Sequence, residues 1–407
     1  MHSDPVEALI VAGRFAAPKT GDEIEKGNAD SAWRAIEADK DGWFVDPLMT
    51  RGGVHVHVEV ESERDEVHLL DASGHAMVYI NGEPRAGDVY SNGQTLLPVQ
   101  LRKGANQFLF IASNRTGRMR AVLAPPKSPL MFSLRDVTAP SLVIGQPVDH
   151  WASVVVINAT TDWIGNAHLE TTGPDGVRGD QALPPLPPLS MRKVGFRFTG
   201  PARDQGGEVE LALRLRRGSK DAKDYRPHDE ATLKLGTRKS TDLHNRTFLS
   251  RIDGSVQYYA LRPVSAPKPD DAKDAKDAKD ANKPDANIAV APTKSGLILA
   301  LHGAAVQADG HAACYGAGVP WAHVVSPTNR TPFGFDWESF GRLDAMEVLD
   351  LTQKELNTDP RRTWLSGHSM GGHSTARCCE LSPRERRPLY ECGPASREWG
   401  REGDGLP

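Results

Sequence analysis

A strand, a sharp turn and a helix are predicted in close succession between residues 363 and 373, and this feature constrains the fold most. The short run Thr363–Ser366 predicts a buried strand, and Gly367-His-Ser-Met-Gly371 follows it. The pattern G-x-S-x-G is typical of a nucleophile elbow, in which the serine projects from a strained turn. Glycines two residues before and after the serine let the backbones pass closely without a Cβ clash. The pattern therefore predicts that Ser369 is a nucleophile, in an elbow formed by Gly367, His368, Gly371 and Gly372.

A second motif lies upstream of the elbow. Leu297–Leu301 is an apolar run that ends at His302-Gly303, as expected of a central parallel strand. Where an elbow is present, the loop after such a strand donates one backbone N–H to an oxyanion, and the residue after the nucleophile donates another. The two donors would be the backbone amides of Ala304 and Met370, and His302 and Gly303 would form the oxyanion loop.

Residues 248–373 resemble the front half of an α/β-hydrolase of the prolyl-oligopeptidase-like, esterase and depolymerase-like group. The residues that carry the resemblance are Ser250–Ala260, Leu301–Gly303, Pro327–Arg330, Phe335–Trp337 and Gly367–Gly372. The resemblance implies a serine hydrolase with a Ser–acid–His triad, no cofactor, and a peptide or ester substrate. A prolyl-oligopeptidase-like peptidase is the leading expectation, and a carboxylesterase of the depolymerase type is the alternative. The alternative of another class is a carbohydrate- or protein-binding module without catalysis.

The triad itself is incomplete in the sequence. The acid and the histidine of this fold follow the nucleophile. After Ser369 the only histidine is His373, inside the predicted helix, and the only aspartate is Asp404. Residues 374–407 contain no Val, Ile, Phe or Met, so we expect an anomalous tail over 376–407 that arises from truncation or a frameshift. Whether the chain is an active enzyme is uncertain, and we expect its activity to be impaired.

The predicted fold class is multidomain, with two N-terminal β-sandwiches followed by a partial α/β-hydrolase, a parallel sheet with helices. Alternating valines from Val54 to Val60 predict a half-buried strand. Residues 1–126 resemble jelly-roll, galactose-binding-like modules, a likeness that implies a carbohydrate partner. Residues 127–237 predict an immunoglobulin-like sandwich. Residues 238–407 would be the incomplete hydrolase domain, and the Asp-Ala-Lys repeats within 268–287 predict a disordered insertion.

Composition excludes several classes of partner. A net charge of −4 and an isoelectric point near 6.4 give no electrostatic basis for nucleic-acid binding. No apolar run reaches the roughly 18–20 residues of a membrane helix. The first residues show no signal peptide, so the protein is nominally cytoplasmic, or secreted or periplasmic if the true N-terminus lies upstream.

The positions of cysteine, histidine and tryptophan bear on metal and aromatic sites. The four cysteines form no CxxC or zinc spacing, so neither a metal site nor a disulfide framework is expected. His55, His57 and Glu59 alternate along one strand and would spread over roughly 13 Å, so a solvated outer face is expected rather than a metal site. Trp151 and Trp163 are predicted core or inter-sheet residues.

Overall fold

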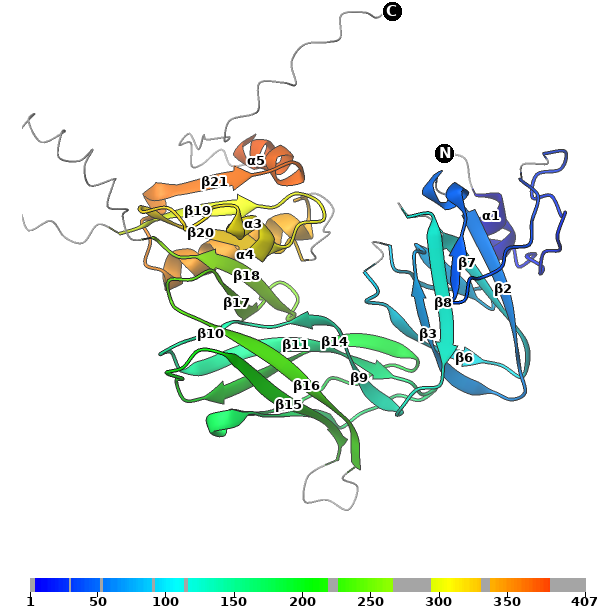
Figure 1. Cartoon of the computed structure of the whole chain (residues 1–407), viewed down its shortest axis with the longest axis horizontal. Helices are drawn as coiled ribbons and strands as arrows, with labels where there is room; N and C mark the ends of the chain where they lie inside the picture. The colour runs from blue at the N-terminus through cyan, green and yellow to red at the C-terminus, as the bar shows by residue number, and fades with distance from the viewer. Residues whose placement is uncertain are drawn as a thin grey trace, which may run out of the picture.

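The computed structural model describes eight stretches of the chain, which are residues 4–28, 31–51, 54–89, 92–112, 116–218, 226–265, 294–330 and 337–380. Strands dominate these stretches and form four sheets (Figure 1). The predicted insertion at 268–287 lies outside the described residues, as does the predicted tail from residue 381 onward.

The first part of the chain is a sandwich of two four-stranded antiparallel sheets. Alternate residues of each sheet point into a shared core that contains Val56, Leu70, Phe108, Phe110 and Met119. The short helices α1 (Pro5–Val11) and η2 (Pro47–Arg51) flank the sheets. One sheet has the order β2 (Val54–Ser62), β7 (Gly104–Ala112), β4 (Met77–Ile80), β5 (Glu83–Ala86), and the other β1 (Trp43–Val45), β8 (Arg118–Ala124), β3 (Glu66–Ser73), β6 (Leu96–Leu101).

Helix α1 lies against the outer face of β2. The Asp4 side chain accepts a hydrogen bond from the Val6 backbone N–H at 2.9 Å and so caps the helix. The His55 ring lies 3.4 Å from the Asp4 carboxylate, and its side chain is only 6% exposed. The prediction of a solvated face is therefore wrong for His55, because α1 covers it. Among the residues described, no group of three or more His, Cys, Asp or Glu residues could hold a metal ion.

The second unit is one eight-stranded sheet that curls around its own core. Strand β9 returns beside β16, where the Phe132 backbone N–H donates to the Asp229 carboxylate at 2.8 Å. The core between the two halves includes Val154, Phe196 and Leu213. The strand order is β10 (Leu142–Val143), β16 (Arg226–Arg238), β15 (Glu208–Arg217), β12 (Ala167–Thr172), β13 (Arg178–Ala182), β14 (Ser190–Gly200), β11 (Val148–Asn158), β9 (Leu130–Thr138), with η3 (Pro174–Gly176) between β12 and β13.

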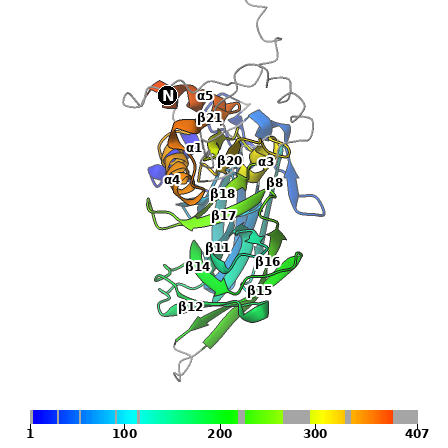
Figure 2. The same ribbon diagram turned by 90° about the vertical axis from the view of Figure 1, so that its left-hand side faces the viewer.

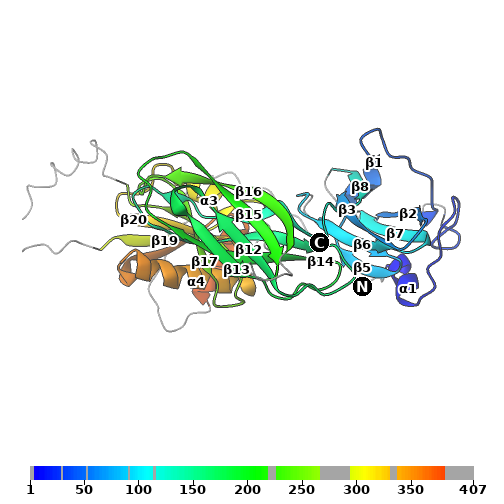
Figure 3. The same cartoon turned by 90° about the horizontal axis from the view of Figure 1, so that it is seen from below.

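The sandwich and the curled sheet lie side by side (Figure 3). Leu69 of β3 packs with Met131 and Ile157, and the Arg135 guanidinium donates to both Asp71 carboxylate oxygens, at 2.6 and 2.9 Å. Trp163 takes no part in a core, because its side chain is 63% exposed, so its predicted core position is wrong.

The last described unit is a five-stranded mixed sheet, seen above the curled sheet in Figure 2. Its strands β20, β19 and β21 are parallel, whereas β17 and β18 form an antiparallel hairpin beside them. The order is β17 (His244–Leu249), β18 (Val256–Arg262), β20 (Ala322–Pro327), β19 (Gly296–Leu301), β21 (Thr363–Gly367), with the helices α3 (Ala308–Ala313), α4 (Phe340–Glu355), η5 (Pro360–Arg362) and α5 (Met370–Glu380).

The predicted fold class needs correction. The described protein is mostly β-sheet, and its C-terminal part is a small mixed sheet rather than the partial α/β-hydrolase domain that was expected. Two of its five strands come from a hairpin, and helices make up a small share of the described residues. The two N-terminal units do have the β-sandwich character that alternating strand patterns indicate. The predicted domain boundaries at 126 and 237 stay predictions.

No helix among the described residues is long and apolar enough to cross a membrane.

Candidate functional site

The residues predicted as an elbow and an oxyanion loop lie together at the carboxyl ends of β19 and β21. These strands pair in parallel, with Leu301 opposite Gly367. The His368 backbone N–H donates to the Leu301 carbonyl oxygen at 3.2 Å, so the two following loops start side by side. A Cβ atom on Gly303 would lie 3.3 Å from the Cβ of Ser369.

Ser369 has a left-handed backbone conformation, with φ of 53°. A non-glycine residue with positive φ is strained and needs surrounding structure to hold it. Here the Gly371 N–H donates to the His368 carbonyl at 2.9 Å, closing the turn before α5. A Cβ atom on Gly371 would lie 2.1 Å from the Leu301 carbonyl oxygen, so only glycine fits there. The Ser369 side chain is exposed.

His302 has a structural role in this cluster. Its ring is fully buried, with Nδ1 2.9 Å from the Gly303 carbonyl oxygen and Nε2 3.2 Å from that of Thr328. The Trp337 indole N–H donates to the His302 carbonyl at 3.0 Å. These bonds fix the loop that carries Gly303 and the exposed Ala304.

No histidine ring is paired with Ser369 in the described part of the chain. His368 and His373 are exposed, and no hydrogen bond joins either ring to the Ser369 hydroxyl. His311 of α3 is mostly buried, and burial lowers its pKa to about 4, with His302 and His368 acting in the same direction. The structure thus brings together the predicted elbow residues Gly367 and Gly372 and the predicted amide donor Met370. It pairs no described histidine with Ser369 as a general base.

A second candidate site is a cleft of about 650 Å³ between the N-terminal sandwich and the curled sheet. Ligand pockets commonly lie between domains and have volumes of about 300–1,000 Å³. Strands β5 and β6 form one wall, and the segment entering β14 forms the other. Charged, hydroxyl-bearing and apolar side chains line the cleft. The residues are Glu83, Arg85, Ala86, Thr95, Leu97, Pro188, Leu189, Ser190 and Met191.

The two walls of the cleft are joined by one charged hydrogen bond. The Arg85 guanidinium donates to the Leu189 carbonyl at 2.9 Å. Burial lowers the pKa of Arg85, and the nearby Glu83 carboxylate opposes that effect. Thr95 and Ser190 each place a hydroxyl at the cleft, and these donate to the carbonyls of Gly87 and Pro187. Their oxygens keep acceptor capacity toward a ligand.

Backbone strain is present at the cleft. Leu189 has φ of 48°, a conformation that a leucine rarely adopts. Its N–H donates to the Thr160 carbonyl at 2.9 Å, while its own carbonyl binds Arg85. Strain held in this way is often found at ligand-binding sites.

Sequence reasoning missed the cleft. Glu83 and Arg85 come just after Asn81-Gly82, and Leu189 ends a proline-rich run. These segments are about a hundred residues apart, and no periodic pattern links them.

No family model matches the chain, and no curated protein matches it. The solved structures found to be similar include an exo-chitosanase from Amycolatopsis orientalis, with 13% identity, a TM-score of 0.27, and coverage of 54% of this chain and 27% of that one. A beta-glucuronidase from Bacteroides uniformis has 16% identity, a TM-score of 0.29, and coverage of 47% and 27%. A glycosyl hydrolase family 2 member from Bacteroides cellulosilyticus has 14% identity, a TM-score of 0.26, and coverage of 53% and 30%. The chain spans about a third or less of the length of these structures.

The resemblance drawn from the sequence was wrong. The described protein is mostly β-sheet, and its last unit is a small mixed sheet rather than the sheet of an α/β-hydrolase of the prolyl-oligopeptidase-like, esterase or depolymerase-like group. The predicted serine peptidase, its carboxylesterase alternative, and the peptide or ester substrate are therefore withdrawn. The physical reason is that the motifs are short. Glycines at a strand–turn–helix crossing satisfy a local steric need, shown by the clashes at Gly367 and Gly371, and a steric need does not specify a family.

Proposed function

We propose that the protein binds carbohydrate in the cleft between the N-terminal sandwich and the curled sheet. The observation that carries the proposal is the composition of this cleft, which combines Glu83, Arg85 and two hydroxyl groups with the apolar side chains of Leu97 and Met191. A sugar ring presents hydroxyls that both donate and accept hydrogen bonds, together with apolar C–H faces. A carboxylate accepts from such hydroxyls, a guanidinium donates to them in a fixed planar geometry, and apolar walls contact the ring.

The cleft is also preorganised for ligand binding. Arg85 is held by the Leu189 carbonyl, and Leu189 is held by Thr160. A preorganised polar group loses less conformational entropy on binding than a free side chain does. The hydrogen bond across the cleft therefore supports recognition by a rigid surface rather than by a flexible loop.

The test is a glycan array probed with the full chain and three variants. We expect retention of at least one glycan class, and a loss of about tenfold or more in affinity for Arg85→Gln and for Glu83→Gln, because each change removes a charged hydrogen-bonding partner. Arg64→Gln is the matched control. That arginine lies on the turn between β2 and β3, with a side chain 80% exposed, and should bind like the parent. Absence of glycan binding, or binding that all three variants retain, would contradict the proposal.

The roles assigned to Ser369, Ala304 and Met370 stay a proposal about individual residues, without an assigned substrate. The support is the strained, exposed Ser369 beside the loop of Gly303. We expect weak labelling by a fluorophosphonate probe that is lost in Ser369→Ala, because a serine without a paired base is a poor nucleophile. Ser366→Ala is the control, since that hydroxyl lies on the preceding strand and is hydrogen-bonded to Tyr315 at 2.8 Å. Equal labelling of Ser369→Ala and the parent would show that Ser369 is not reactive.

A further inference from the structure

Helix α4 has apolar side chains on its outer face as well as on the face that packs against the mixed sheet. The inner face places Ala345 and Val348 in the core of that unit. The outer face carries Phe340, Leu343 and Met346, whose exposed fractions are 59%, 42% and 50%. Because these residues recur at every third position, they follow one another along the solvent side of the helix. Exposed apolar surface gathered in one place is typical of a site of protein association.

Two charges of opposite sign lie beside this apolar surface. Arg342 and Asp350 stand four residues before and four residues after Met346, so the three residues form one row that spans about 12 Å of the helix. Both charged side chains are exposed. Among the residues that the structure describes, neither of them forms an ion pair or a side-chain hydrogen bond.

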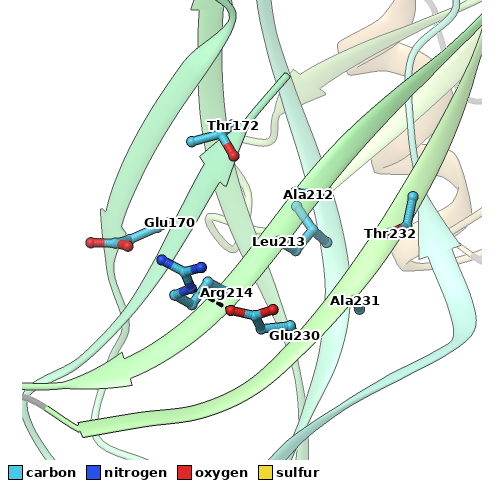
Figure 4. Close-up of a pocket in the computed structure, with 8 residues that line it drawn as sticks. All are labelled: Glu170, Thr172, Ala212, Leu213, Arg214, Glu230, Ala231 and Thr232. Atoms are coloured by element: carbon cyan, nitrogen blue, oxygen red, sulfur yellow. Dashed lines mark hydrogen bonds and ion pairs between the residues drawn. The ribbon is translucent and has the colours of Figure 1, made fainter. Parts of the chain in front are cut away.

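Several charged side chains on the curled sheet, by contrast, are paired within the chain. On its outer face the Arg214 guanidinium donates to the Glu230 carboxylate at 2.6 Å, across two neighbouring strands (Figure 4). Arg197 donates to both Asp149 carboxylate oxygens at 2.7 Å. The two charges on α4 therefore stand out as able to pair with groups from outside the chain.

A second copy of the same helix supplies the complementary charges. In an antiparallel pair of α4 helices centred on Met346, Arg342 of each copy lies at the level of Asp350 of the other copy. The two Met346 side chains meet between these ion pairs, with Leu343 beside them. A two-fold interface requires this reciprocity, in which residue i contacts j and j contacts i. A parallel pair would instead place arginine beside arginine, and like charges oppose association.

We propose that the protein self-associates through α4, with a second copy of this chain as the partner. The contact is a single pair of helices, so it belongs to the small and transient class of interfaces, and we expect dimers at roughly 10–100 μM. The surface lies on the mixed-sheet unit, and the proposal does not depend on carbohydrate binding in the cleft.

Sedimentation velocity of the full chain over a range of concentrations tests the proposal. A reducing agent is present, because Cys314 is free and exposed. We expect Arg342→Glu and Asp350→Arg each to weaken self-association about tenfold or more, because each change brings like charges together at both ion-pair positions. The double variant Arg342→Glu/Asp350→Arg should dimerise like the parent. An equimolar mixture of the two single variants should also dimerise, because both contacts then join opposite charges.

Arg64→Glu is the matched control, because that side chain is 80% exposed and lies on the N-terminal sandwich, so the variant should self-associate like the parent. Met346→Asp gives an independent measurement. It places two carboxylates at the centre of the pair and should abolish self-association, while the buried side of the helix is unchanged. A parent that is monomeric at about 100 μM, single charge variants that self-associate like the parent, or a mixture of them that stays monomeric would overturn the proposal.

Discussion

We expect Arg216→Met to lower the free energy of unfolding of the curled sheet by about 3–5 kcal/mol, because it leaves a buried carboxylate without its partner. Arg216 is 3% exposed and Glu170 is 7% exposed, and a hydrogen bond of 2.7 Å joins them. The guanidinium also donates to Asp180 and to the Gly218 carbonyl. A methionine fills a similar volume but supplies no donor. Urea denaturation followed by circular dichroism measures the loss.

Arg214→Met is the control, since it removes an arginine two residues earlier on the same strand. Its ion pair with Glu230 is exposed, with side chains 49% and 64% exposed, and such pairs contribute about 0–1 kcal/mol. The double variant Arg216→Met/Glu170→Gln should recover part of the loss, because the amide is uncharged. Equal stability of the Arg216 and Arg214 variants would show that burial does not matter for this pair.

The second large expected effect is the pH dependence of the stability of the N-terminal sandwich. His75 is 1% exposed and packs edge-on against Phe110, with ring centroids 5.3 Å apart. Neither of its ring nitrogens has a hydrogen-bond partner among the described residues. Burial lowers its pKa from 6.5 to about 4, against the opposing influence of the Asp88 carboxylate.

The direction in which stability changes with pH follows from proton binding. Between pH 6.5 and about 4, the unfolded chain binds a proton at His75 that the folded chain excludes. The folded state therefore loses stability as the pH falls through this window, by about 3 kcal/mol in total for a shift of this size. We expect His75→Leu to lose that part of the acid sensitivity. Thermal unfolding of parent and variant between pH 7 and 4 gives the difference, and parallel curves would contradict the assignment.

Local patterns predicted much of the secondary structure. The valine alternation forms β2, the apolar run ending at Leu301 forms β19, and the glycine-flanked Ser369 does follow strand β21 and precede helix α5. Each of these features depends on neighbours a few residues away, so a short window of sequence is enough to predict it.

The family, the fold class and the binding residues could not be predicted from short windows of sequence. The elbow glycines reflect the crossing of two backbones, and the family inference drawn from them was wrong. The bond between Arg85 and Leu189 depends on how two sheets pack. The ion pair of Glu170 with Arg216 depends on the pairing of β12 with β15, two strands that are not consecutive in the sequence. Trp163 appeared suited to a core, but its loop carries it outward.

The return of β9 beside β16 has a consequence for how this protein behaves in concentrated solution. A strand that ends a sheet normally presents unpaired backbone groups, on which another chain can add a strand. Here β9 lies beside β16, and the Asp229 carboxylate accepts a hydrogen bond from the Phe132 N–H where they meet. That N–H is therefore not available to an added strand, which should make this end of β9 a poorer template for association with another chain.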